Sequence, residues 1–188
     1  MHFGENNTWI NINSDLISEY SAIYDTYDID DEMIEYALDK NERAHMEYNR
    51  RTKTLVVIYN VLNLSREENH YDTIPLTFVV RQNQIVTISN SLNEYIIDQI
   101  REELEENMHW SVFNFLLHSL FAISENYFPV IEKLNKEQQK ISQLLRKKTT
   151  KDNLFRLSDL EIEGMYLVSA TKQNAVVLEQ LKTQQAFK

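Results

Sequence analysis

The stretch TKTLVVIYNVLN, residues 52–63, holds an almost continuous run of apolar side chains, several of them β-branched. Such a run is typical of a strand that lies in the middle of a sheet and is covered on both faces. We therefore expect a central strand here, with the rest of the fold arranged around it.

Nearby segments have the patterns of neighbouring strands. TWININ (8–13) alternates bulky apolar and polar residues, which predicts a short strand. IPLTFVV (74–80) and IVTIS (85–89) flank the polar segment RQNQ, which predicts a hairpin, while SREENHYD (65–72) is predicted to be a loop. Together these segments supply the strands of one sheet.

Helical periodicity occurs in the same region. LISEYSAIYDTY (16–27) spaces apolar and aromatic residues as one helix, so its tyrosines are predicted to belong to the core. EMIEYALDK (32–40) follows a capping segment, and NSLNEYIIDQIREELEE (90–106) is predicted to form a helix with Ser91 as its cap. The strands and helices predict an α/β (α+β) head over residues 1–108.

Residues 109–188 change character, with apolar positions recurring every three or four residues as in a coiled coil. If the first seam forms one continuous helix from Trp110 to Lys148, that helix is about 58 Å long, and Pro129 is expected to kink it. A second seam predicts an antiparallel partner, and Gly164 on it is expected to allow close backbone approach. The head is too small to cover such helices, so contact with another subunit or a missing part of the chain is expected.

The composition excludes several kinds of site. The 188 residues include no cysteine, which rules out disulfides, zinc–thiolate sites and cysteine nucleophiles. Only two glycines and two prolines occur, which disfavours a glycine-lined nucleotide loop. Neither a signal peptide nor an apolar stretch of the roughly 20 residues that a bilayer needs is visible, so the chain as given is expected to be soluble.

Charge is distributed unevenly along the chain, whose formal net charge is −10. Residues 1–50 carry 12 acidic and 3 basic side chains, whereas residues 131–188 carry 7 acidic and 11 basic ones. An acidic head argues against nucleic acid as a partner. The basic residues at the expected hairpin tip are Arg146, Lys147, Lys148 and Lys151; a solvated role is favoured over an acidic partner or anionic lipid.

The charged stretch LDKNERAHMEYNRR (38–51) brings His45 close to Glu42 and Glu47, which at first suggests metal or acid–base chemistry. No second histidine stands at helical spacing, and no H-E-x-x-H pattern occurs, so a solvated approach to the central strand is favoured. The acidic run DIDDE (28–32) lacks the glycine of a calcium loop and is predicted to cap a helix. With no catalytic constellation, the protein is predicted not to be an enzyme.

The order of these segments resembles the N-terminal cytoplasmic domain of the CorA-type magnesium transporter family. The similarity is carried by TWINI, IEYALDKNERAHMEY, LVVIYNVLN, LTFVVRQNQIVTIS and LSDLEIEGMYLVSATKQNAVVLEQLK. It implies an α/β/α sandwich head with a mixed sheet, followed by a long antiparallel helical hairpin. It also implies a homopentamer at the cytoplasmic face of the cell membrane, in a chain truncated before the stalk and transmembrane helices.

The resemblance further implies a regulatory Mg²⁺ between subunits, held in part by an aspartate of an E-D-x-L stretch. This sequence has Glu35-Tyr36 at that position, so Tyr36 replaces the aspartate and the site is in question. Glu35 and Asp39 lie within one helical turn of Tyr36 and are the candidate substitutes, since Mg²⁺ prefers oxygen ligands.

The function that follows is a regulatory cytoplasmic domain of a CorA-like divalent-cation channel, in which cation sensing and subunit packing are coupled to a membrane pore outside this chain. A zinc-transporting relative would share the domain. The alternative from another class is a stand-alone soluble adaptor that binds a partner through its coiled-coil hairpin.

Overall fold

A computed structural model describes residues 1–67 and 70–183. The strands are β1 (His2–Phe3), β2 (Asn7–Asn13), β3 (His45–Asn49), β4 (Thr54–Glu67), β5 (His70–Arg81) and β6 (Gln84–Ser89). The helices are η1 (Ser14–Leu16), α1 (Ala22–Thr26), α2 (Asp31–Leu38), α3 (Glu94–Glu106), α4 (Val112–Glu125), α5 (Tyr127–Lys147) and α6 (Lys151–Thr183).

The described strands form one six-stranded sheet in the order β1-β2-β6-β5-β4-β3. β2 pairs parallel with β6 and every other pair is antiparallel, so the sheet is mixed as expected. The opening stretch forms β4, next to one edge, and it pairs with β5 over most of its length. The predicted hairpin is confirmed, with Gln82 and Asn83 between β5 and β6.

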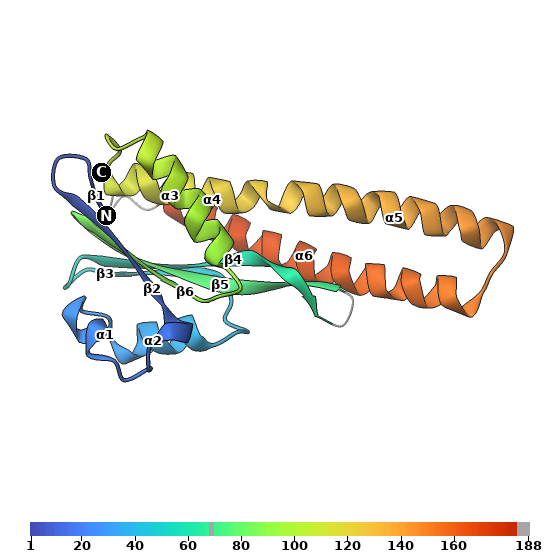
Figure 1. Cartoon of the computed structure of the whole chain (residues 1–188), viewed down its shortest axis with the longest axis horizontal. Helices are drawn as coiled ribbons and strands as arrows, with labels where there is room; N and C mark the ends of the chain where they lie inside the picture. Colours follow the sequence, from blue (N-terminus) through green and yellow to red (C-terminus); the bar gives the residue numbers. More distant parts are fainter. Residues whose placement is uncertain (68–69, 184–188) are drawn as a thin grey trace.

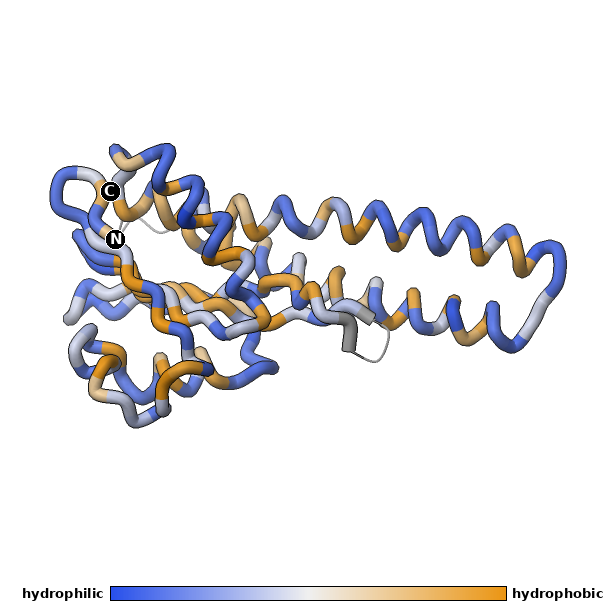
Figure 2. The backbone as a smooth tube through the Cα atoms, in the orientation of Figure 1, coloured by the Kyte–Doolittle hydropathy of each residue, from blue (hydrophilic) through white to orange (hydrophobic). Residues whose placement is uncertain are grey.

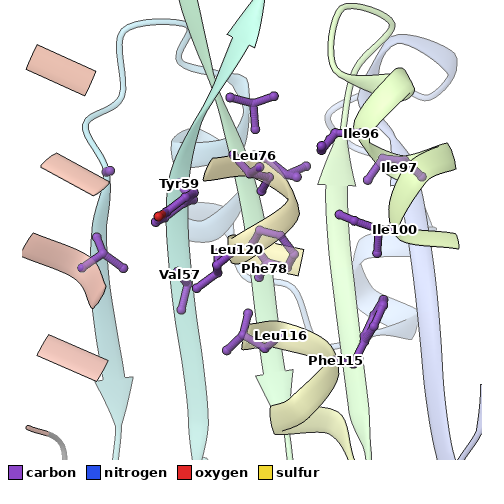
Figure 3. Close-up of a cluster of buried hydrophobic side chains, with 14 of the residues drawn as sticks. Val57, Tyr59, Leu76, Phe78, Ile96, Ile97, Ile100, Phe115, Leu116 and Leu120 are labelled. Carbon is purple, nitrogen blue, oxygen red and sulfur yellow. The ribbon is translucent and has the colours of Figure 1, made fainter. Parts of the chain in front are cut away.

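Helices cover both faces of the sheet, which confirms the α/β/α sandwich (Figure 1). Alternate residues of a strand point to opposite faces, so one run of apolar residues supplies two cores. Val79, Val86 and Ile88 pack with α1 and α2 residues on one face. On the other face, Val57, Tyr59, Leu76 and Phe78 meet α3 and α4 (Figure 3); the labelled helix residues there are Ile96, Ile97, Ile100, Phe115, Leu116 and Leu120.

The last two helices form the predicted antiparallel hairpin, which projects beyond the sheet (Figure 1). The segment from Trp110 to Lys148 is not one continuous helix, because α4 ends at Glu125 and α5 begins at Tyr127. Pro129 is the physical reason: it has no N–H to donate, and the first turn of a new helix needs none. The break replaces the expected kink, and it lets α4 stay on the sheet while α5 leaves it.

Several local expectations are also wrong. The helix predicted over 16–27 is reduced to η1 and α1, and both Leu16 at the end of η1 and Tyr20 of the intervening segment are exposed. Part of the charged stretch forms the edge strand β3, paired with β4, so it is more than an approach to a strand. The residues expected as a loop continue β4 to Glu67 and begin β5 at His70; residues 68–69 lie outside the described part.

Two further expectations, the N-cap of α3 and the role of Gly164, also differ from the structure. Helix α3 takes Asn93 as its N-cap, while the Ser91 side chain and N–H both bind the Asp15 carboxylate. Gly164 does not bring two backbones together, because a Cβ placed there would meet no atom within 4 Å. At that level a groove of about 860 Å³ separates α5 from α6.

Candidate functional site

The predicted metal ligands lie on α2, at the acidic face of the head. Glu35 and Asp39 are both exposed, and Asp39 is the C-cap residue of the helix. The Asp39 N–H donates to the Glu35 carbonyl (3.0 Å), and the Asp39 carboxylate accepts from the Asn41 N–H (2.9 Å). One carboxylate is therefore engaged in the turn that ends α2.

Tyr36, which stands where the resemblance implies an aspartate, links α2 to the edge strand β3. Its hydroxyl lies 3.0 Å from Glu32 Oε1 and 3.3 Å from Glu47 Oε1, so two carboxylates share one phenol proton. The hydrogen bond to Glu32, followed by desolvation and the charge of Glu47, raises the pKa of Tyr36 to about 12. Tyr36 is thus a neutral donor at physiological pH.

His45 completes this contact on β3. Its Nδ1 lies 2.8 Å from the Arg43 carbonyl oxygen, which can only accept, so Nδ1 carries the hydrogen. Nε2 then faces Glu47 Oε1 at 3.8 Å, and the ring meets Tyr36 edge-on with centroids 5.0 Å apart. His45 therefore has a structural partner on each side.

Tyr36 and its partners Glu32 and Glu47 border a shallow depression of about 260 Å³ between α2 and the β3–β4 edge. Among the residues that the structure describes, no group of three or more acidic or histidine side chains is placed to hold a metal ion. The donors of one chain therefore do not fit a complete magnesium site. The roles of Glu35 and Asp39 stay a prediction that needs further oxygen ligands from outside this chain.

A second arrangement joins the head to the hairpin at the sheet edge. β3 pairs with β4 only as far as Ile58, so the backbone of Asn60 projects beyond the end of β3. Asn174 of α6 takes the place of the missing strand: its Oδ1 accepts from the Asn60 N–H and its Nδ2 donates to the Asn60 carbonyl, both at 2.9 Å. Opposite Asn60 on the other side is Pro75, which has no N–H to offer.

The same carbonyl of Asn60 accepts a hydrogen bond of 2.8 Å from the Tyr127 hydroxyl at the start of α5. Burial raises the pKa of Tyr127, so its hydroxyl stays a donor. The Asn60 side chain and the Ala44 N–H both donate to Gln173 Oε1 of α6. Both α5 and α6 thus form hydrogen bonds with Asn60 of β4.

Glu163 ties α6 to the far end of β5. Its side chain is almost completely buried, and Oε1 accepts the backbone N–H of Tyr71 at 3.0 Å. From α5, Lys133 Nζ reaches the Tyr71 hydroxyl at 3.2 Å and lies over its ring. Sequence reasoning missed Asn60, Asn174 and Glu163; the available signal was a polar residue at a position where the periodicity demands an apolar one.

Helix α6 has a second apolar stripe that nothing in the described part of the chain covers. One face packs on the sheet and on α5 through Leu167, Ala170 and Val177. The other face exposes Phe155 (69%) and Met165 (70%), together with Ile162 and Val176. A helix that is apolar on two faces is normally covered on both.

Comparison with known protein families identifies the family to which this fold belongs. The family model described as "CorA-like Mg2+ transporter protein" matches residues 4–187. The chain belongs to this CorA-like family. Comparison with the curated proteins finds no sequence match.

Solved structures agree with the fold of this CorA-family chain. The complete CorA magnesium transporter from Methanocaldococcus jannaschii is 18% identical with a TM-score of 0.80; the match covers 95% of this chain and 56% of the transporter. The soluble domain of the same transporter is 21% identical over 94% of this chain and 70% of the domain, with a TM-score of 0.75. This chain therefore spans just over half of the complete transporter.

A third structure, the ZntB cytoplasmic domain from Vibrio parahaemolyticus, is 13% identical over 98% of this chain and 90% of that domain, with a TM-score of 0.52. All three identities are low, so the structures establish the shared fold alone.

Within the described residues, no helix is both long and apolar enough to cross a membrane.

Proposed function

We propose that this chain is the regulatory cytoplasmic domain of a CorA-like divalent-cation channel, positioned at the cytoplasmic face of the cell membrane. The observation that carries the proposal is the uncovered stripe of α6, with Ile162, Met165 and Val176 on a helix already buried on its other side. Such a stripe requires a further helix or a neighbouring copy. Membership of a transporter family supports a homo-oligomer around a pore, with five copies proposed by analogy, over an enzyme.

The bonds between head and hairpin support a mechanical role. Because Asn174, Gln173 and Glu163 of α6 bind backbone or side-chain groups of the head, a tilt of the head carries the hairpin with it. Any ligand that prefers one packing of neighbouring heads then biases the hairpins too. The regulated quantity is subunit packing.

The regulatory ion remains a separate hypothesis. Glu35 and Asp39 are exposed on the acidic face, and one chain lacks the donors for a complete site. We propose that Mg²⁺ binds there only where a second copy supplies further oxygens. The position of Tyr36 between two carboxylates leaves it a proton donor, so it does not replace the aspartate as an anionic ligand.

Sedimentation and calorimetry with millimolar Mg²⁺ test whether Mg²⁺ binds at Glu35 and Asp39 and whether this binding requires a second copy. We expect Mg²⁺ to shift the chain toward a larger species with measurable binding heat, and the double variant Glu35→Ala, Asp39→Ala to lose both effects. The matched control is Glu102→Ala, Glu106→Ala, two exposed carboxylates with the same spacing on α3. An unchanged heat in the first double variant would eliminate Glu35 and Asp39 as ligands.

Assembly without metal tests the packing role independently. Replacing Ile162 and Met165 by serine is expected to weaken self-association of the chain. If the variant assembles normally, or the chain instead pulls down a different protein through this stripe, the adaptor alternative gains. Zn²⁺ in place of Mg²⁺ in the same calorimetry addresses which cation the domain recognises.

A further inference from the structure

The turn between α5 and α6 carries an isolated cluster of positive charge. Residues 140–156 contain six basic side chains and one acidic one, Asp152. All six are exposed: Lys140, Arg146, Lys147, Lys148, Lys151 and Arg156. In the part of the chain that the structure describes, none of these six forms an ion pair. We call residues 140–156 the basic tip.

Helix electrostatics account for only part of this cluster. Arg146 and Lys147 lie in the last turn of α5, where cations interact favourably with the helix dipole. Lys151 lies in the first turn of α6, where a cation is unfavourable and only Asp152 offsets it. A positive side chain at this position therefore adds nothing to the stability of the hairpin.

Apolar side chains are exposed among the cations. Leu144 precedes the turn, and Leu154 and Phe155 follow it in the first turn of α6, with Phe155 69% exposed. Figure 2 shows a mainly hydrophilic turn with a few hydrophobic positions along the two helices that it joins. Basic residues interleaved with Phe and Leu are the composition of segments that lie in the headgroup region of a bilayer.

The tip is also the part of the molecule most distant from the sheet. α5 has 21 residues, which gives it a length of about 30 Å, and it leaves the sheet after its first turns (Figure 1). Most acidic residues of the head lie on and around α1, α2 and α3, which Figure 1 shows at the end of the molecule away from the tip. The tip can therefore approach an anionic surface without bringing the acidic head close to it.

We propose that the basic tip binds the anionic headgroups of a membrane surface, with Phe155 and Leu154 entering the interface. The acidic head of a second copy could pair with the basic side chains, but it would leave the exposed aromatic and aliphatic residues uncovered. A lipid surface contacts both kinds of residue, so lipid is the favoured partner. This inference goes beyond the proposed function and does not depend on metal sensing, since it rests on the charge, exposure and position of the tip.

Co-sedimentation with vesicles tests it on the chain of 188 residues. We expect binding to phosphatidylglycerol-containing vesicles, weakened by salt, and no binding to pure phosphatidylcholine. Each cation near an anionic surface contributes about fivefold in partitioning, so Lys147→Gln, Lys148→Gln, Lys151→Gln is expected to lose on the order of a hundredfold. Phe155→Ser is expected to cause a smaller loss of vesicle binding. Because this loss is apolar in origin, added salt does not reproduce it.

The matched control removes three exposed lysines from the same helices outside the tip: Lys136→Gln, Lys172→Gln, Lys182→Gln. It has the same net charge as the tip variant and is expected to keep most of the binding. Equal losses in the two triple variants would overturn the proposal, as would equal binding to neutral vesicles. So would a tip variant that loses self-association in sedimentation while still binding vesicles. Circular dichroism verifies that each variant is folded.

Discussion

The head, here taken together with α4, and the hairpin of α5 and α6 contain similar apolar side chains, but the chain covers them to different extents. Phe115 of α4 is fully buried against the sheet, whereas Phe155 of α6 is 69% exposed. Helices cover both faces of the sheet, and the inner face of α6 is among them, whereas the outer face of α6 stays open. The difference indicates that the sheet, its covering helices and the inner face of α6 form one core, and that the outer face of α6 is shaped for contacts with other surfaces.

The largest expected effect comes from comparing these two phenylalanines. Phe115→Ala removes a ring that packs on Phe3 and Trp9, and we expect it to lower the free energy of unfolding by about 3–5 kcal/mol. Phe155→Ala is expected to change it by less than about 0.5 kcal/mol. Urea denaturation measures both, and equal losses would show that the hairpin face is covered after all.

The junction between the two regions gives the next largest effect. Asn174→Ala leaves the buried N–H of Asn60 without a partner, because Tyr127 can replace only the bond to the carbonyl. We expect a loss of about 1–3 kcal/mol. Gln180→Ala, an exposed amide farther along α6, is the control and should be nearly neutral. If the two variants were equally stable, the junction would contribute nothing.

The two glycines provide a pair with opposite expected signs. Gly4 has a φ of +56°, and a Cβ there would lie 2.9 Å from the Trp110 carbonyl oxygen, so Gly4→Ala is expected to destabilise by about 2 kcal/mol. Gly164 lies inside α6 with open space around it, so Gly164→Ala is expected to stabilise by about 0.5–1 kcal/mol. Thermal melts measure both, and a destabilising Gly164→Ala would point to a contact inside the groove.

The smallest expected effect is a pH dependence within the head. Hydrogen bonds from the hydroxyl and N–H of Ser91 hold the pKa of Asp15 below its ordinary value. A lowered pKa in the folded state means that the stabilisation is complete above the unfolded pKa and is lost as the pH falls through the folded one.

Because Asp15 is largely exposed, we expect a slope that amounts to about a few tenths of a kcal/mol between about pH 5 and about pH 2. Asp15→Asn and Ser91→Ala should both flatten this part of the stability curve, which urea denaturation at several pH values measures. A curve unchanged in both variants would contradict the role assigned to this bond.

The sequence was sufficient to predict those strands in which a run of apolar residues follows from burial of the strand. The run through Val57 and Tyr59 predicted a central strand because both of its faces are apolar, and the hairpin around Gln82 was equally legible. The edge strand β3 was missed, since a strand with one solvated side and charged residues such as Glu47 has no apolar run. The segment around Tyr20 was assigned to a helix by its spacing, although the structure leaves Tyr20 exposed.

The candidate site was less predictable for the same reason. Sequence spacing placed Glu35 and Asp39 one turn apart, but the partners of Tyr36 come from two elements, Glu32 on α2 and Glu47 on β3. No local pattern records that these elements are neighbours. The break before Tyr127 was also indicated only ambiguously, because Pro129 is compatible with either a kink or a new helix start.

By itself, the sequence determined the class of fold, the presence of a long helical pair and the contrast between an acidic head and a basic tip, because hydrophobic period and charge are local properties of the chain. Only the tertiary structure decided that Asn174 takes the place of a strand beside Asn60, and which face of α6 stays uncovered. Those outcomes depend on which backbone groups and surfaces remain unpaired once the sheet has formed, and residues more than a hundred positions apart supply the partners.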